Sequence, residues 1–163
     1  MKRIAVVVGA ICFVGAMTAV AVAVAGTHGG SQAVTTIRLV EKTQGFHFID
    51  NPPLGGPNQP PSAGDQFVLI SSLWTKSGRR AGTLRATCAV VAGGPNAAFT
   101  CFGTFGLKGG QLAGIATVRN NAKVTHIAIV GGTGAYEGAH GSVASVSRGN
   151  NSPFSDDTIR LLP

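Results

Sequence analysis

Short apolar runs alternate along the chain with clusters of turn-forming residues. The runs are rich in Val, Ile, Thr and aromatic residues, and Gly, Pro, Asn and Ser separate them, which is typical of β-strands joined by tight turns. None of these runs shows a helical period of apolar positions over about eleven residues. The pattern predicts eight strands, at residues 34–43, 65–75, 79–92, 97–107, 110–119, 123–131, 135–147 and 158–162.

Eight short strands at even spacing predict an all-β domain, either a barrel or a sandwich. Glycine supplies 24 of the 163 residues, about twice its usual share. Because glycine permits sharp strand bends, this composition favours a small closed barrel. Residues 44–64 hold five of the eight prolines and are predicted to form an irregular connection, since proline lacks an amide donor.

The segment from His126 to Gly141 is an apolar run that breaks into closely spaced glycines. Its start resembles a dinucleotide-binding loop, but the third glycine of G-x-G-x-x-G is replaced by Glu137. No helical stripe follows, and only 25 residues remain after Gly138. The sequence therefore favours two strands joined by a glycine-rich corner over a nucleotide site.

The N-terminus has the pattern of a secretory signal. Two basic residues open the chain, and the uncharged 22-residue run at 4–25 ends in Ala-Val-Ala. We expect a signal peptide at 1–25, cleaved after Ala25, a flexible lead-in at 26–33 and a β-barrel domain at 34–163. The run is also long enough to span a bilayer, so an uncleaved membrane anchor is the alternative. Either way we expect an exported protein, secreted or anchored outside the cytoplasm.

The chain is basic, with a formal net charge of +7. Without the first two basic residues, 11 basic and 6 acidic side chains remain. The basic residues are dispersed along the sequence, with Arg79-Arg80 as an adjacent pair, whereas a nucleic-acid binder usually clusters them among aromatic residues. An ordinary solvated surface is favoured, and no nucleic-acid partner is expected.

Cys88 and Cys101 are predicted to form a disulfide, because an even pair in an exported chain usually does so. Cys12 lies in the signal segment. If residues 93–96 form a hairpin loop, residue 92 pairs with residue 97 and Cys88 directly faces Cys101.

A metal site is not expected, because two thiols do not complete a tetrahedral set. His126 and His140 flank the glycine corner, but no third ligand stands at a suitable spacing. His28 and His47 lie apart from them. No cofactor is predicted.

Several short motifs resemble the allene oxide cyclase barrel family, and the resemblance extends from Ile37 to Val146. The motifs are Gly64-Asp65, Leu73-Trp74-Thr75, Arg80-Ala81-Gly82, Ala86-Thr87-Cys88, Gly109-Gly110-Gln111 and the glycine corner from Gly131 to Gly141. Plant dirigent proteins, of the same superfamily, are similar at residues 51–57 and 130–134.

The resemblance implies an eight-stranded antiparallel barrel whose apolar lumen binds a small apolar molecule. In this superfamily the lumen holds one conformer of a reactive substrate, so positioning supplies much of the catalysis. The protein is therefore predicted to direct a cyclisation or isomerisation. The alternative is a non-catalytic secreted barrel that binds a ligand or acts at the cell envelope. A homo-oligomer is compatible with either prediction.

The resemblance also suggests catalytic residues. Glu41 matches the first-strand Glu of the cyclases and shares a face with Ile37 and Leu39, inside or outside the barrel. Inside, it would be a candidate base or a stabiliser of developing positive charge. Ser71 and Thr43 stand where the cyclases carry Asn.

The lumen Cys of the cyclases matches Cys88, which is predicted to be oxidised here. These departures argue against allene oxide cyclase activity itself. The dirigent acid corresponds to Asp50, without a matching Arg. Trp74 and Tyr136, the single Trp and Tyr of the chain, are candidate ligand-binding residues in the core or cavity lining.

Overall fold

The computed structural model describes residues 33–52, 54–55, 59–120, 122–149 and 152–163. The predicted signal peptide at 1–25 and nearly all of the predicted lead-in lie outside the described residues. Within the described residues, no helix is long and apolar enough to cross a membrane.

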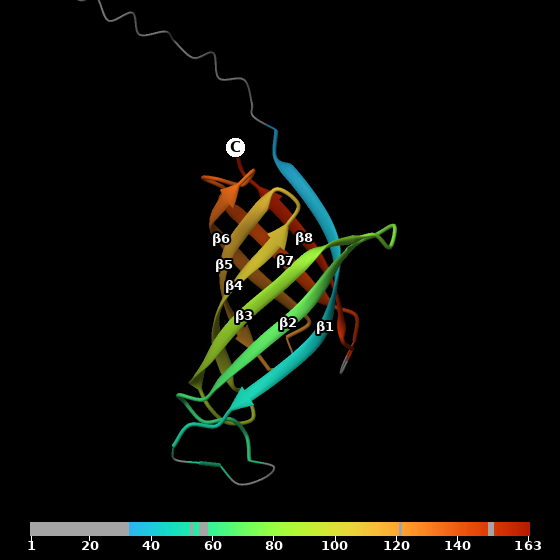
Figure 1. The fold of residues 1–163 in the computed structure, drawn as a ribbon. Helices are drawn as coiled ribbons and strands as arrows, with labels where there is room; N and C mark the ends of the chain where they lie inside the picture. Colours follow the sequence, from blue (N-terminus) through green and yellow to red (C-terminus); the bar gives the residue numbers. More distant parts are fainter. Residues whose placement is uncertain (1–32, 53, 56–58, 121, 150–151) are drawn as a thin grey trace, which may run out of the picture. The chain divides into compact units, whose positions relative to one another are not determined.

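The described residues form eight antiparallel strands that close into a barrel (Figure 1). Each strand pairs with the next in sequence, and β1 also pairs with β8, so the predicted eight-stranded antiparallel barrel is confirmed. The strands are β1 Thr35–Ile49, β2 Gln66–Thr75, β3 Arg80–Ala92, β4 Ala98–Leu107, β5 Gly110–Arg119, β6 Val124–Gly134, β7 Gly141–Ser147 and β8 Phe154–Leu161.

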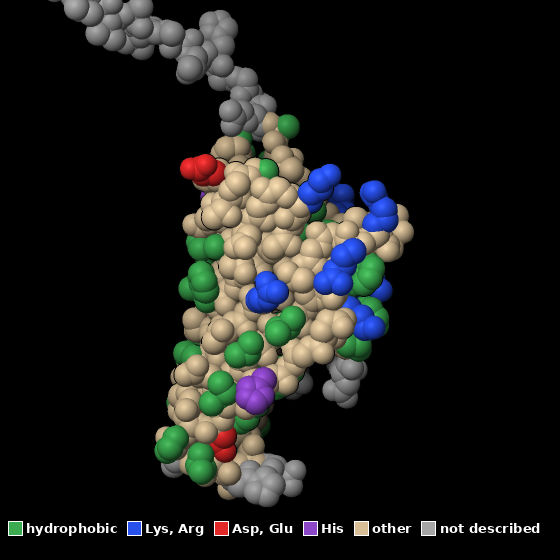
Figure 2. Space-filling view, viewed as in Figure 1, with side chains coloured by type: hydrophobic (Ala, Val, Ile, Leu, Met, Phe, Trp, Pro, Cys, Tyr) green, Lys and Arg blue, Asp and Glu red, His purple; other side chains and the backbone are tan. Residues whose placement is uncertain are grey.

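Side chains alternate between the lumen and the outer surface along each strand. On β1, for example, Leu39 and Glu41 are buried while Arg38 and Lys42 are not. The outward positions carry the charged residues seen on the surface (Figure 2).

Three strand boundaries differ from the sequence prediction by four residues or more, and the others by at most three. β1 continues to Ile49, because the first prolines of the predicted connection come only after that residue and Phe46 and Phe48 pair with β2. β7 begins at Gly141, since residues 135–140 form the corner itself. β8 begins four residues earlier than predicted, at Phe154, because ladders with both β1 and β7 outweigh the poor strand propensity of Asp.

The β3–β4 hairpin contains the Cys88–Cys101 disulfide, which confirms the predicted pairing. The prediction that residue 92 pairs with residue 97 is wrong, because Ala92 pairs with Ala98. A bulge between Val90 and Ala92 absorbs the difference, so the cysteines still face each other.

The glycine segment joins β6 to β7 through a tight corner, as predicted. Gly134 and Gly138 adopt φ values of 61° and 73°, which favour glycine. A Cβ on Gly132 would collide with the carbonyl oxygen of Tyr136, so the corner folds back closely on the end of β6. The backbone here closes a turn between strands and does not open a helix.

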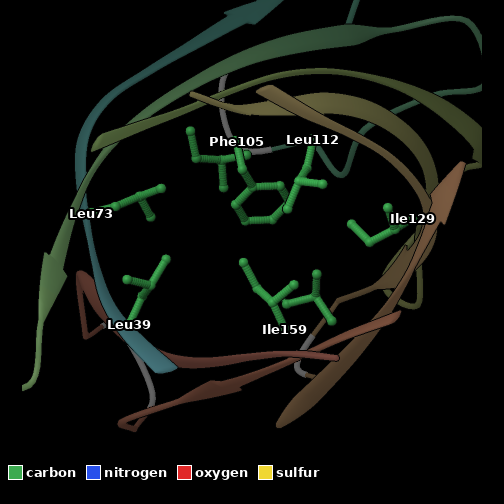
Figure 3. Packing of buried hydrophobic residues seen from close by; sticks show 8 residues of the cluster. Leu39, Leu73, Phe105, Leu112, Ile129 and Ile159 are labelled. Carbon is green, nitrogen blue, oxygen red and sulfur yellow. The ribbon is translucent and has the colours of Figure 1, made fainter. Parts of the chain in front are cut away.

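The lumen contains two hydrophobic clusters. The larger one, called here the packed cluster, draws side chains from every strand toward the barrel axis (Figure 3). Its buried members are Leu39, Leu73, Leu84, Phe105, Leu112, Ile129, Val143 and Ile159. The smaller cluster consists of Cys88, Val90, Ala97 and Phe99 near the β3–β4 loop.

Candidate functional site

The lumen is hollow beside the packed cluster. A cavity of about 240 Å³ lies there, lined by residues from all eight strands. The lining residues are Glu41, Thr43, Phe67, Leu69, Leu84, Ala86, Cys88, Cys101, Gly103, Phe105, Gly114, Ala116, Val118, Thr125, Ile127, Ser145 and Ser155.

The cavity exists because the wall formed by β3, β4 and β5 carries small side chains. Ala86 pairs with Gly103, which pairs in turn with Gly114, so three neighbouring positions project almost nothing inward. A Cβ on Gly103 would lie 2.9 Å from the Cβ of Ala86, and one on Gly114 would lie 2.8 Å from Cγ2 of Ile127. The disulfide extends this smooth apolar wall.

The opposite wall is polar. β6, β7, β8 and β1 contribute Thr125, Ser145, Ser155, Thr43 and Glu41 to the cavity. A molecule in the lumen would therefore contact apolar groups on one side and hydroxyl and carboxyl groups on the other.

Glu41 lies at the inner end of this polar wall, and its side chain is 7% exposed. Glu41 pairs with Ser155 on β8 and with Leu73 on β2. Asp157 and Ser71 occupy the diagonal positions on the same two strands, because Asp157 pairs with Leu39 and Ser71 with Thr43. Diagonal side chains on one face of a sheet are within reach of each other.

Burial raises the pKa of Glu41 from 4.5 to about 7, and repulsion from Asp157 adds to the rise. Burial likewise raises the pKa of Asp157. Within the described part of the chain, the Ser71 hydroxyl and both carboxylate oxygens of Asp157 are buried without a hydrogen bond of good geometry. Ser71 still lies close enough to Glu41, and Ser145 close enough to Asp157, to lower the pKa of each carboxyl group slightly. Two unpaired buried charges are costly, so the pair retains a proton near neutral pH.

Asp157 is a site residue that the sequence did not single out, because the last strand was predicted to begin only at residue 158. It is 1% exposed and lies inside the barrel. Asp157 stands two residues before the fully buried Ile159, and residues two apart on a strand share a face. That alternation could have identified Asp157 if the strand had been predicted to begin earlier.

The other predicted site residues separate in space. Cys88, Cys101 and Thr43 line the cavity, and Ser71 is buried just beyond it. Trp74 follows the inward Leu73 and lies outside, under the Arg80 guanidinium at 5.5 Å. The position of Trp74 does not support its predicted role in ligand binding.

Tyr136 packs against the packed cluster, away from the cavity, and its hydroxyl donates to the carbonyl of Lys108 at 3.4 Å. The carboxylate of Asp50 accepts a hydrogen bond from the Gly55 amide at 3.1 Å in the β1–β2 connection and does not reach the lumen. Among the described residues, no group of three or more His, Cys, Asp or Glu side chains is placed to hold a metal ion.

Aromatic rings lie between the cavity and one mouth of the barrel. The Phe67 ring lies tilted against Phe46, at 4.9 Å between ring centroids, and makes an edge-to-face contact with Phe99 at 5.2 Å. A mouth pocket of about 330 Å³ lies on their outer side and shares Phe67 and Val118 with the lumen cavity.

Comparison with known proteins gives structural matches alone, since no family model and no curated protein sequence matches the chain. Pyocyanin demethylase superimposes with a TM-score of 0.66 and 22% identity over 78% of this chain and 99% of that one. The pterocarpan synthase dirigent protein PsPTS1 superimposes with a TM-score of 0.63 and 13% identity, over 81% of this chain and 95% of that one. The Diels Alderase AbmU from Streptomyces koyangensis superimposes with a TM-score of 0.56 and 15% identity, over 83% of this chain and 72% of that one.

These likenesses show that the chain has the same barrel fold as these proteins, the dirigent protein among them, as its motifs predicted.

Proposed function

We propose that this barrel binds a small, mostly apolar organic molecule in its lumen and directs a cyclisation or isomerisation of that molecule. The observation that carries the proposal is the position of Glu41. Its carboxyl group lies at the inner end of the polar wall, facing a cavity whose other wall is apolar, and its pKa is about 7. An acid–base group is most effective when its pKa lies near the working pH.

The two walls of the cavity supply the two parts of this activity. The smooth wall around Gly103 and Gly114 restricts the conformers that fit, and holding one reactive conformer lowers the entropic part of the barrier. Protonated Glu41 would donate to a carbonyl or similar oxygen, and ionised Glu41 would stabilise developing positive charge. Asp157 helps burial to raise the pKa of Glu41 to about 7, where both the protonated and the ionised form are populated at neutral pH.

The names of the structural relatives agree with this class of substrate. The names pyocyanin demethylase, pterocarpan synthase dirigent protein and Diels Alderase each refer to reactions of small organic molecules. At 13–22% identity they support the proposal through the fold and not through shared residues.

Quinoline binding tests occupation of the lumen. Ala86 lines the cavity, whereas Ala89 is exposed on the outer face of the same strand. Fluorescence titration measures the affinity for quinoline. We expect wild type and Ala89→Phe to bind with equal affinity. Ala86→Phe should bind at least about tenfold more weakly, because its ring fills the cavity. Equal binding by all three proteins would place the ligand elsewhere.

The same ligand tests the acid. Protonated Glu41 can donate a hydrogen bond to the ring nitrogen of quinoline, and ionised Glu41 cannot. Wild type should therefore bind quinoline more tightly at pH 6 than at pH 8, on either side of the Glu41 pKa of about 7. Glu41→Gln should retain binding with an affinity that is the same at both pH values. Binding by wild type that is independent of pH would favour the second function, a passive ligand carrier.

We also propose that the barrel works outside the cytoplasm. The Cys88–Cys101 disulfide supports an oxidising compartment, and the sequence pattern at 1–25 supports export. Mass spectrometry of the exported protein should find Gly26 as its first residue. An intact Met1–Ala25 segment on membrane-bound material would favour the anchor instead.

A further inference from the structure

Basic residues that are dispersed in sequence gather on one half of the barrel. The region spans β8, β1, β2 and β3. The cations project from β8, β1, β3 and the adjoining turns, and Figure 2 shows Lys and Arg side chains gathered over β1 to β3 and the turn between β2 and β3. We call this surface the basic face. Its cations are Arg38, Lys42, Lys76, Arg79, Arg80, Arg85, Arg148 and Arg160.

Little of this charge is neutralised. Asp156 is the outward acidic residue on these four strands, and it already binds Arg148 at 2.9 Å and Lys76 at 3.8 Å. Those are the ion pairs found among the described residues. Arg38 and Arg85 therefore project from mid-strand without a carboxylate partner, which leaves a strong positive potential on this face.

The other half of the barrel is different. Within the described strands, β4, β6 and β7 carry no Lys, Arg, Asp or Glu, and β5 carries only Arg119, at its last residue. The remaining cations of the barrel, Lys108 and Lys123, lie in turns on that side. The charge asymmetry thus belongs to the fold and not only to the composition.

Aromatic side chains lie between the cations of the basic face. The Arg80 guanidinium covers the ring of Trp74 at 5.5 Å, and Lys42 and Arg148 lie over Phe154 at 5.6 and 5.9 Å. These ring faces are occupied, so they do not offer the free stacking platforms that single-stranded nucleic acids require. Trp edges beside cations are, however, typical of a membrane–water interface.

We infer that the basic face docks the barrel on an anionic lipid surface. The cations come from three strands and two turns and do not converge on one pocket, which fits many phosphate headgroups better than a single anion. Arg, which supplies six of the eight cations, binds phosphate through a planar fork of donors. Docking there would also bring the barrel to the phase in which apolar molecules concentrate.

Vesicle binding tests this inference with a matched pair of variants. Residues Ser31–Pro163 form a compact unit, so this fragment avoids the apolar N-terminal run. One triple variant carries Arg38→Glu, Lys42→Glu and Arg85→Glu, and its control carries Lys108→Glu, Arg119→Glu and Lys123→Glu. Both change the net charge equally. A milder triple with Gln at positions 38, 42 and 85 serves if the first fails to fold by circular dichroism.

We expect wild type to sediment with vesicles containing about 30% phosphatidylglycerol, not with pure phosphatidylcholine, and to be released by salt. The basic-face triple should lower the partition coefficient at least about tenfold, and the control triple far less. Equal losses would assign binding to net charge alone, and no binding by wild type would overturn the inference. Equally tight binding of oligo(dT) or polyphosphate through the same residues would replace the lipid surface with a soluble polyanion.

Discussion

Glu41 and Asp157 show how a residue's neighbours determine its chemistry. Each carboxyl group faces a lumen that water cannot solvate well, so burial raises the pKa of both, and repulsion from Asp157 raises the pKa of Glu41 further. Asp156, next in sequence to Asp157, faces outward to Arg148 and has a lowered pKa because it accepts that side chain's hydrogen bonds. One position of strand alternation thus separates a surface ion from a buried acid.

Glu41 should make stability depend on pH. The unfolded chain loses the Glu41 proton near pH 4.5, whereas the folded chain keeps it until about pH 7. The folded state therefore binds more protons between these values, and the free energy of unfolding should fall as pH rises through this window and then level off. At pH 8, Glu41→Gln should be more stable than wild type by up to about 3 kcal/mol, measured by urea unfolding.

Near pH 4 the two proteins should be equally stable, because Glu41 is then protonated in both states. Glu137→Gln, at an exposed site in the corner, is the control and should change nothing at either pH. A Glu41→Gln advantage that is independent of pH would contradict the assignment of a buried, protonated carboxyl group.

At the scale of elements, the β6–β7 corner depends on two adjacent glycines in different ways. Gly131 has open space where a Cβ would stand, whereas a Cβ on Gly132 would meet the backbone of Tyr136 and lie 2.9 Å from the carbonyl oxygen of Gln111. The close approach holds the corner against β5. The glycine pattern in the sequence therefore combines one structural requirement with one replaceable residue.

Substituting alanine at these two positions should separate them. Gly132→Ala should lower the free energy of unfolding by about 1–3 kcal/mol, because backbone on both sides leaves no room for a methyl group. Gly131→Ala should stay within about 0.5 kcal/mol of wild type. Chemical denaturation measures both, and equal effects would contradict the close approach of the corner to β5.

The β3–β4 hairpin should depend strongly on its disulfide. The Cys88–Cys101 bond closes a loop between residues 13 apart, and its loss should cost about 2–5 kcal/mol. The double Ala variant should therefore unfold at lower denaturant concentration than oxidised wild type. Reductant should destabilise wild type and leave the variant unchanged; free thiols in the purified native protein would contradict the pairing.

At the scale of the molecule, the lumen combines a packed half with a hollow half. Leu73 and Leu69 show the difference, because both face inward from β2. Leu73 is fully buried in the packed cluster, whereas Leu69 lines the cavity. The barrel thus obtains its core packing at one end and keeps its binding space at the other.

Truncating these two leucines tests that division. Leu73→Ala should lower the free energy of unfolding by about 2–5 kcal/mol, because it creates a cavity in a filled region. Leu69→Ala should cost less, because its side chain already borders empty space, and it should enlarge the quinoline site. Thermal unfolding compares the two, and equal losses would indicate that the cavity is filled in solution.

The sequence alone determined the architecture. Strand runs, turn clusters and the glycine corner are local signals, and turn chemistry set the hairpin that brings Cys88 opposite Cys101. The first-strand Glu41 could be singled out as a candidate because a carboxylate stood among aliphatic residues. Where a strand bordered a polar segment, local signals failed, as at the end of β1 and the start of β8.

Only the tertiary structure decided which face of each strand became the lumen. Inward or outward orientation depends on register and closure across all eight strands, and the sequence of one strand is compatible with both. Closure placed Glu41 beside Asp157, moved Trp74 outside and gathered dispersed cations into one face. These are contacts between residues distant in sequence, and their energies arise only when the barrel has formed.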